Sequence, residues 1–225
     1  MIKKIVLLFI FMSVWWGSRG WINTKKIECY TQFGLCSEEI TNKLSWLKRT
    51  PLLFPLPQKK VADQLLTYPN IKSMRLYRRL PFTLVVSVNL RKPLGVITDQ
   101  VLGLKIVVDQ DGVVIDRLEK SQLPQLLVDY DPNKYKSGDQ LTPPENKALQ
   151  ILAVISSLSG KQALGQLHGT ILEAVLSDTT RILLDLKYLD PKWDSTLHLI
   201  LSRSKIQAKV PKTIDLRFSS PIIGF

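Results

Sequence analysis

The stretch RRLPFTLVVSVNLRKPLGVI, residues 78–97, decides the fold of the first half of the chain. Within residues 82–90 apolar and polar side chains alternate, and Val85 is the one apolar residue on the polar side. This period of two is typical of a half-buried strand in an antiparallel sheet. A Leu-Pro pair at 80–81 predicts a tight turn before the strand, and Pro93 predicts its end.

Two helices are expected before this strand. The first follows Ser37, which favours the N-cap position, and its apolar residues recur at helical spacing up to residue 47. The second covers residues 58–68 and is stopped by a proline. With strands at 25–30 and 71–79, residues 25–97 are expected to run strand, helix, helix, strand, strand, with both helices on one face of a three-stranded sheet.

Residues 98–225 are expected to form a second domain of mainly antiparallel strands with two helices. DQDG at 109–112 and SDTT at 177–180 separate apolar runs and predict hairpin turns. A capping box at 142–145 starts the first helix, and the Asp-Pro pair at 190–191 starts the second. The fold class expected for the whole chain is therefore α+β.

The N-terminal segment MIKKIVLLFIFMSVWWGSRGWI indicates export, and two interpretations are open. Residues 5–22 form a transmembrane signal anchor after a cytoplasmic tail at 1–4, or the apolar run at 5–16 is the core of a cleaved signal peptide. Tryptophans at 15, 16 and 21 favour the anchor, since they suit the outer membrane interface. In both cases two lysines keep the N-terminus inside, and the bulk of the chain lies outside the cytoplasm.

The chain carries a net charge of +12, which attracts polyanions. Outside the cytoplasm nucleic acid is not an expected partner, so anionic lipid or an anionic wall polymer becomes the candidate ligand. The plainer alternative is that the basic surface keeps the domain soluble.

Export also bears on whether the two cysteines are oxidised to a disulfide. Cys29 and Cys36 are the only two cysteines, so a four-cysteine zinc site is excluded. In an oxidising compartment they are expected to form a disulfide. The alternative is a buried free thiol at each position.

No group of residues in the sequence predicts catalysis. His168 and His198 lie far from any nucleophile motif and are interpreted as structural or surface histidines. None of the 11 glycines forms a phosphate-binding loop. We therefore expect no enzyme activity, no metal and no cofactor.

Residues 69–97 carry a recognisable pattern of a proline and an aliphatic residue, a basic strand, Leu-Pro, an alternating strand and a charged pair before proline. It is formed by Pro69, Ile71, Met74, Leu76, Arg78, Leu80, Pro81, Leu84, Val86, Val88, Arg91, Lys92 and Pro93. This pattern resembles the POTRA signature of the FtsQ/DivIB cell-division family. VVDQDGVVI at 107–115 resembles the family's next hairpin, and IDLRFSSPIIGF at 214–225 resembles its last strand. The chain departs from the family in having Arg-Lys where Glu-Arg is usual.

The resemblance implies a POTRA-like β-α-α-β-β domain at 25–97, a C-terminal β domain at 98–225 and a non-enzymatic role in the divisome at the septum. Such proteins hold bitopic partners of the FtsL and FtsB/DivIC type, and their C-terminal domain binds by strand addition. Carried over by motif, the partner-binding residues are Arg217, which would meet a carboxylate, Phe218, which would be an apolar anchor, and Ser220.

Two alternatives accompany this interpretation. At the site, Ile214, Leu216 and Phe218 would fill the sheet core, with Asp215 and Arg217 as a solvated pair. For the whole chain, the function would be that of an exported POTRA-type envelope module that binds anionic wall polymer or unfolded envelope proteins.

Overall fold

The computed structural model describes residues 23–48, 50–51, 55–99, 104–130, 134–176 and 180–225. The chain divides into two compact units between Arg91 and Lys92, and each is described by itself. The tail expected at 1–4 and the anchor expected at 5–22 lie outside the described residues. Among the helices in the described ranges, none is long and apolar enough to cross a membrane.

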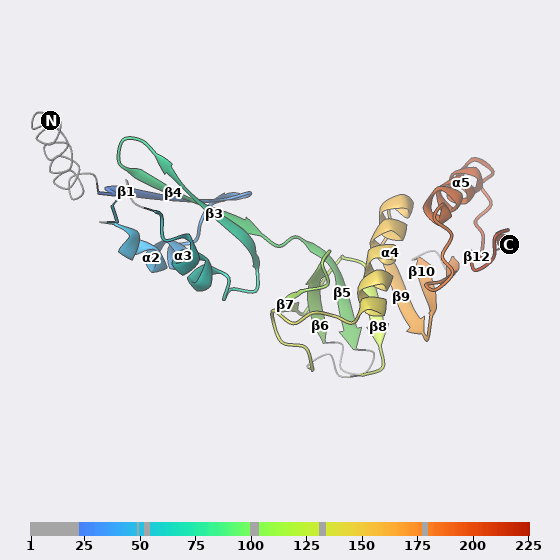
Figure 1. Cartoon of the computed structure of the whole chain (residues 1–225). Helices are drawn as coiled ribbons and strands as arrows, with labels where there is room; N and C mark the ends of the chain where they lie inside the picture. The colour runs from blue at the N-terminus through green and yellow to red at the C-terminus, as the bar shows by residue number, and fades with distance from the viewer. Residues whose placement is uncertain (1–22, 49, 52–54, 100–103, 131–133, 177–179) are drawn as a thin grey trace, which may run out of the picture. The chain divides into compact units, whose positions relative to one another are not determined.

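The first unit is a small sheet with helices on one side (Figure 1). Its elements are β1 (Lys26–Thr31), β2 (Gly34–Leu35), α2 (Glu38–Lys43), the 3-10 turn η2 (Ser45–Leu47), α3 (Gln58–Leu65), β3 (Ile71–Arg79) and β4 (Thr83–Leu90). The order expected from the sequence is present, but β2 adds a fourth strand to the three that were expected. The sheet order is β2-β1-β4-β3, with β1 parallel and β3 antiparallel to β4.

The alternation in β4 builds the core of this unit. Leu84, Val86 and Val88 are buried against the face that α2, η2 and α3 cover, because alternate side chains of a strand point to one side. Leu47 and Leu65 are fully buried from the helical side. Val85, the exception in the pattern, is buried on the opposite face, where the side chains of β1 and β3 cover it.

A disulfide joins β1 to the segment just before α2. It connects Cys29 and Cys36, whose Cα atoms lie 5.3 Å apart. Cys29 is buried in the core of the unit. The bond therefore holds the start of the helical layer against the sheet.

The second unit contains one nine-stranded sheet and two long helices. Its elements are β5 (Pro93–Asp99), β6 (Lys105–Asp109), β7 (Val114–Leu118), β8 (Gln125–Val128), α4 (Pro143–Ser159), β9 (Ala163–His168), β10 (Ile171–Leu176), β11 (Arg181–Asp185), α5 (Trp193–Ile206), β12 (Thr213–Asp215) and β13 (Ile222–Gly224). The sheet order is β13-β12-β11-β10-β9-β8-β5-β6-β7. The chain is α+β, as the sequence predicts.

The sheet is mixed, with antiparallel neighbours in the majority and parallel pairs that the sequence did not predict. Five neighbouring pairs are antiparallel and three are parallel. Two of the parallel pairs, β8 with β9 and β11 with β12, are joined through α4 and α5 respectively. A helix between two adjacent strands carries the chain back to its starting end, so the second strand must run parallel to the first.

Strand β5 belongs to this larger sheet. Ile97 pairs with Ile106 of β6 and with Leu126 of β8. The sequence assigned residues 93–97 to the first region, whereas their hydrogen-bonded neighbours all lie in the second unit.

Helix α4 is the centre of the second core. The capping box at its start is present: the backbone N–H of Thr142 donates to Glu145 Oε2 at 3.1 Å. Tyr130 and Tyr135 also donate to this carboxylate. The helix ends at Gly160 in the left-handed conformation, with φ of 69°. Leu149, Leu152 and Ile155 are fully buried between the helix and the sheet.

Candidate partner-binding edge

The nine-stranded sheet has two edges, and they differ in how far they are closed. At β7 the backbone N–H of Val114 donates to Asp139 O at 2.9 Å, and Gly138 N–H donates to Val114 O at 2.8 Å. The rest of β7 carries the exposed charges of Asp116 and Arg117, which discourage strand addition. Strand β13 pairs with β12 on one side, and no strand of the described chain lies on its other side. The edge at β13 is therefore the open one.

The edge of the sheet does not lie at the segment that the sequence suggested for partner binding. Strand β12 ends at Asp215, and β13 covers it, with Ile214 opposite Ile223. Arg217, Phe218 and Ser220 lie in the connection between the two strands. These three residues are thus beside the edge and not part of an edge strand.

Arg217 is held in place by Asp215. Its Nε donates to both carboxylate oxygens at 2.9 and 3.1 Å, and its Nη2 donates to Oδ2 at 2.6 Å. The hydrogen bond from this guanidinium holds the pKa of Asp215 below its usual value, and the carboxylate raises the pKa of Arg217. A guanidinium has five N–H donors, so others stay available for a partner carboxylate.

The three apolar residues of this segment differ in their burial. Ile214 and Leu216 are buried in the core, as the alternative interpretation of the site expected. Phe218 is 56% exposed, and the Arg217 guanidinium carbon lies 5.6 Å from the centre of its ring. Ser220 is exposed as well. Phe218 is consequently a surface residue with a stacked cation and not a core residue.

Sequence reasoning missed an apolar groove between α5 and β13. The groove has a volume of about 440 Å³, and Leu199 and Arg203 of α5 face Ile223 and Phe225 across it. Leu199 is 57% exposed and Phe225 is 51% exposed. The signal in the sequence was the run IIGF at the C-terminus, whose four residues are too few to show a periodicity.

The residues of β13 alternate between the two faces of the sheet, and an added strand would meet them on both faces. Ile223 lies opposite the buried Ile214, so it faces the helical side and lines the groove. Ile222 lies opposite Asp215 and faces the other side, where it is 59% exposed. An extended peptide beside β13 would therefore find an apolar neighbour on each face.

Cations surround this apolar surface. Arg203 lies in the groove, and Lys209 Nζ is 4.3 Å from the ring centre of Phe225. Together with Arg217, these groups favour a partner that carries carboxylates. The arrangement can bind an extended acidic segment with alternating apolar side chains.

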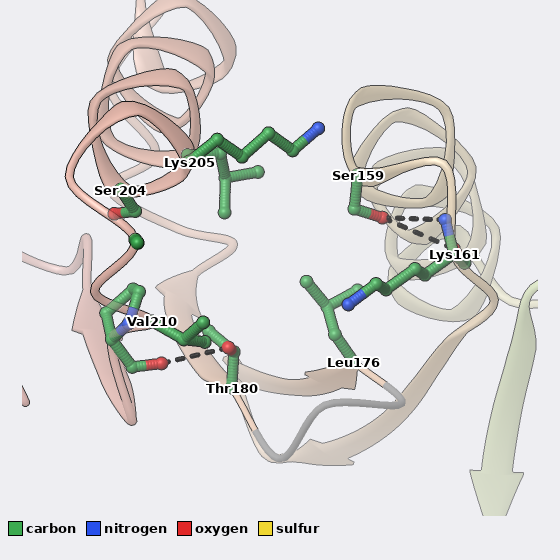
Figure 2. Close-up of a pocket in the computed structure, with 10 residues that line it drawn as sticks. Ser159, Lys161, Leu176, Thr180, Ser204, Lys205 and Val210 are labelled. Carbon is green, nitrogen blue, oxygen red and sulfur yellow. Dashed lines mark hydrogen bonds between the residues drawn. The ribbon is translucent and has the colours of Figure 1, made fainter.

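A second cavity lies between the C-terminal ends of α4 and α5 and has a volume of about 280 Å³ (Figure 2). Lys161 and Lys205 enter it from opposite sides, above an apolar floor that includes Leu176 and Val210. The hydroxyl of Thr180 donates to Pro211 O at 2.9 Å, and that of Ser159 donates to Lys161 O at 3.3 Å. The described residues that line it include hydroxyls and lysines but no carboxylate or imidazole.

His168 and His198 are exposed, the first at the end of β9 and the second on α5. Within the described ranges no three His, Cys, Asp or Glu side chains gather as a metal site would require. The edge at β13 is therefore the feature with the clearest functional geometry.

Comparison with known protein families finds no model that matches this chain, and comparison with curated proteins finds no relative.

Proposed function

We propose that this protein is a non-enzymatic, single-pass membrane scaffold of the bacterial divisome, of the FtsQ/DivIB type. In this proposal the N-terminus is cytoplasmic, residues 5–22 anchor the chain, and both compact units lie outside the cytoplasm at the septum. The first unit is the POTRA-like domain. The partners are bitopic division proteins of the FtsL and FtsB/DivIC type.

The observation that carries the proposal is the open edge at β13 beside an apolar groove. Edge strands offer unpaired N–H and C=O groups that another extended chain can satisfy. Ile223 and Phe225 supply apolar contacts on the helical face, and Ile222 supplies them on the other. Backbone pairing would give affinity and these side chains would select the partner.

The three residues carried over by motif act at one end of this edge. Phe218 is exposed enough to be a packing anchor for the partner. Arg217, already oriented by Asp215, would present its remaining N–H groups to a partner carboxylate. Ser220 would offer a hydroxyl in the same connection.

The disulfide supports the expected compartment. Disulfides persist in oxidising environments, outside the bacterial cytoplasm. The bond between Cys29 and Cys36 is consistent with an exported first unit.

The test is photo-crosslinking in cells with a photoreactive residue at Phe218 or Phe225, and at Lys120 near the β7 edge as control. We expect one small membrane protein to be captured at 218 and 225 and not at 120. Ile223→Asp should abolish the adduct, because it places a charge in the groove. Leu118→Asp, at a similarly exposed apolar residue on β7, should leave it intact.

An adduct at Lys120 equal to that at Phe218, or an adduct that survives Ile223→Asp, would rule out binding at β13. The alternative of an envelope module for anionic wall polymer relies on the net charge of +12. It predicts binding that falls steeply as salt is raised, whereas pairing along an edge strand with apolar contacts should depend on salt only weakly.

A further inference from the structure

One end of the first unit's sheet collects cations around an exposed apolar turn. We call this end the basic tip and define it as Lys25, Lys26, Arg79 and Leu80. Lys26 of β1 and Arg79 of β3 both pair with Thr83 of β4, one on each side. The backbone N–H groups of Lys25 and Lys26 donate to Phe82 O at 2.9 and 3.2 Å. These contacts bring residues from distant parts of the sequence to one end of the sheet.

The basic tip carries three cations and Glu28, the carboxylate that pairs with two of them. Glu28 accepts from Lys26 at 2.8 Å and from Arg79 at 2.6 Å, so a single carboxylate serves two cations. The Lys26 and Arg79 side chains stay 68% and 55% exposed in these pairs. Lys25 is also exposed, so these three cations and one carboxylate carry a net charge of +2.

An exposed apolar side chain lies among these cations. Leu80 is 80% exposed at the turn between β3 and β4. Phe82 packs beneath Lys25, whose Nζ lies 4.5 Å from the ring centre. An exposed leucine surrounded by lysine and arginine matches the membrane interface, where apolar groups enter the acyl boundary and cations meet the headgroups.

The basic tip also follows closely after the apolar N-terminal segment in the sequence. Asn23 bridges to Pro51, and Thr24 N–H donates to Thr50 O at 3.0 Å, directly before Lys25. Residues 5–22 immediately precede Asn23 and carry the apolar sequence expected to enter the bilayer. A chain that leaves the membrane at residue 22 thus reaches the basic tip within three residues.

We propose that the basic tip docks on anionic phospholipid headgroups, with Leu80 in the interface. The occupant is the outer leaflet of the membrane in which the chain is anchored. This inference relies on the anchoring part of the proposed function and is independent of partner binding at β13. Each cation near an anionic surface contributes about 1 kcal/mol, which corresponds to about a fivefold change in the docking equilibrium.

The experiment uses the full chain reconstituted in vesicles. An environment-sensitive fluorophore is attached at Leu80→Cys, and a control fluorophore at Leu66→Cys, which lies after α3 near the start of β3, at the opposite end of the sheet. Quenching by brominated lipid is compared in phosphatidylcholine vesicles and in vesicles that also contain phosphatidylglycerol. We expect strong quenching at position 80 in the anionic vesicles, weak quenching in the neutral ones and none at position 66.

Charge variants make the test specific. Lys25→Gln should lower the docked fraction about fivefold, while Lys59→Gln on α3 should leave it unchanged. Equal quenching in neutral and anionic vesicles would overturn the proposal, and so would a signal at position 80 that a soluble polyanion produces without lipid.

The two proposals fail in different ways. If the chain floats with the vesicles but position 80 is not quenched, only docking of the tip is overturned. If the chain does not float at all, the membrane anchor of the proposed function is wrong and the tip proposal is wrong with it.

Discussion

At the scale of single residues, Asp215 shows how one side chain can prepare another for binding. It fixes the Arg217 guanidinium through two of its nitrogens and accepts the Arg217 backbone N–H at 3.0 Å. Less motion is then lost when a partner binds, because the arginine is already ordered. The two residues lie two positions apart, with Asp215 at the end of β12 and Arg217 in the connection to β13, where the sequence contains no periodic signal.

Asp215→Asn should lower the free energy of unfolding of the second unit by about 0.5–1 kcal/mol at neutral pH, since the pair is partly exposed. The folded pKa of Asp215 lies below its ordinary value of 3.8. Its contribution is therefore complete above that value and disappears as the pH falls through the lower, folded pKa. Denaturant unfolding of both proteins at neutral and strongly acidic pH checks this, with Asp194→Asn on α5 as control. A difference that grows on acidification would contradict the assignment.

At the scale of elements, close contact between α4 and β9 shapes the second unit. A Cβ atom at Gly165 of β9 would lie 2.5 Å from Leu152 Cδ1 and 2.7 Å from its Cδ2. Leu152 is fully buried, so it has little room to move. The glycine therefore sets how near the helix comes to the sheet.

Gly165→Ala should destabilise the second unit by about 1–3 kcal/mol, because the added methyl group overpacks the core. The measurement is the free energy of unfolding in denaturant. Gly224→Ala is a matched control in the same sheet, since its Cβ would make only ordinary contact, 3.6 Å from Thr213. Equal effects of the two substitutions would show that the Leu152 contact does not limit the packing.

Elements whose signal lies in neighbouring residues of the sequence were predicted, whereas features that depend on pairing between distant strands were not. The alternation at 82–90 and the capping box at 142–145 are set by neighbouring residues, and both elements appear where expected. The parallel pairs were missed because pairing was inferred from turns alone, although helices between strands imply parallel neighbours. The edge at β13 could not be predicted, because a three-residue strand depends on its pairing with β12 and not on its own sequence.

At the scale of the whole molecule, the two units have separate hydrophobic cores, and the disulfide belongs to the first alone. A bridge that spans seven positions constrains mainly the unfolded form of the segment around it. Its effect should accordingly be confined to one unit.

Replacing Cys29 and Cys36 together by serine should lower the stability of the first unit by about 2.5 kcal/mol on the loop-entropy model. The second unit should be unaffected. Amide hydrogen exchange of β4 and of α4 in the full chain reports the two units separately. Equal loss of protection in both would mean that they unfold as one.

The two edges of the large sheet differ in how far they are closed, and this difference limits how copies of the chain can assemble. A sheet that is open at both ends can add copies of itself in succession and grow into a fibre. Here hydrogen bonds from Gly138 and to Asp139, together with exposed charges, obstruct the β7 end, so within this sheet strand addition is favoured at β13. Each copy of the chain then offers one open end of this sheet, so copies can pair through β13 but cannot add to one another in succession.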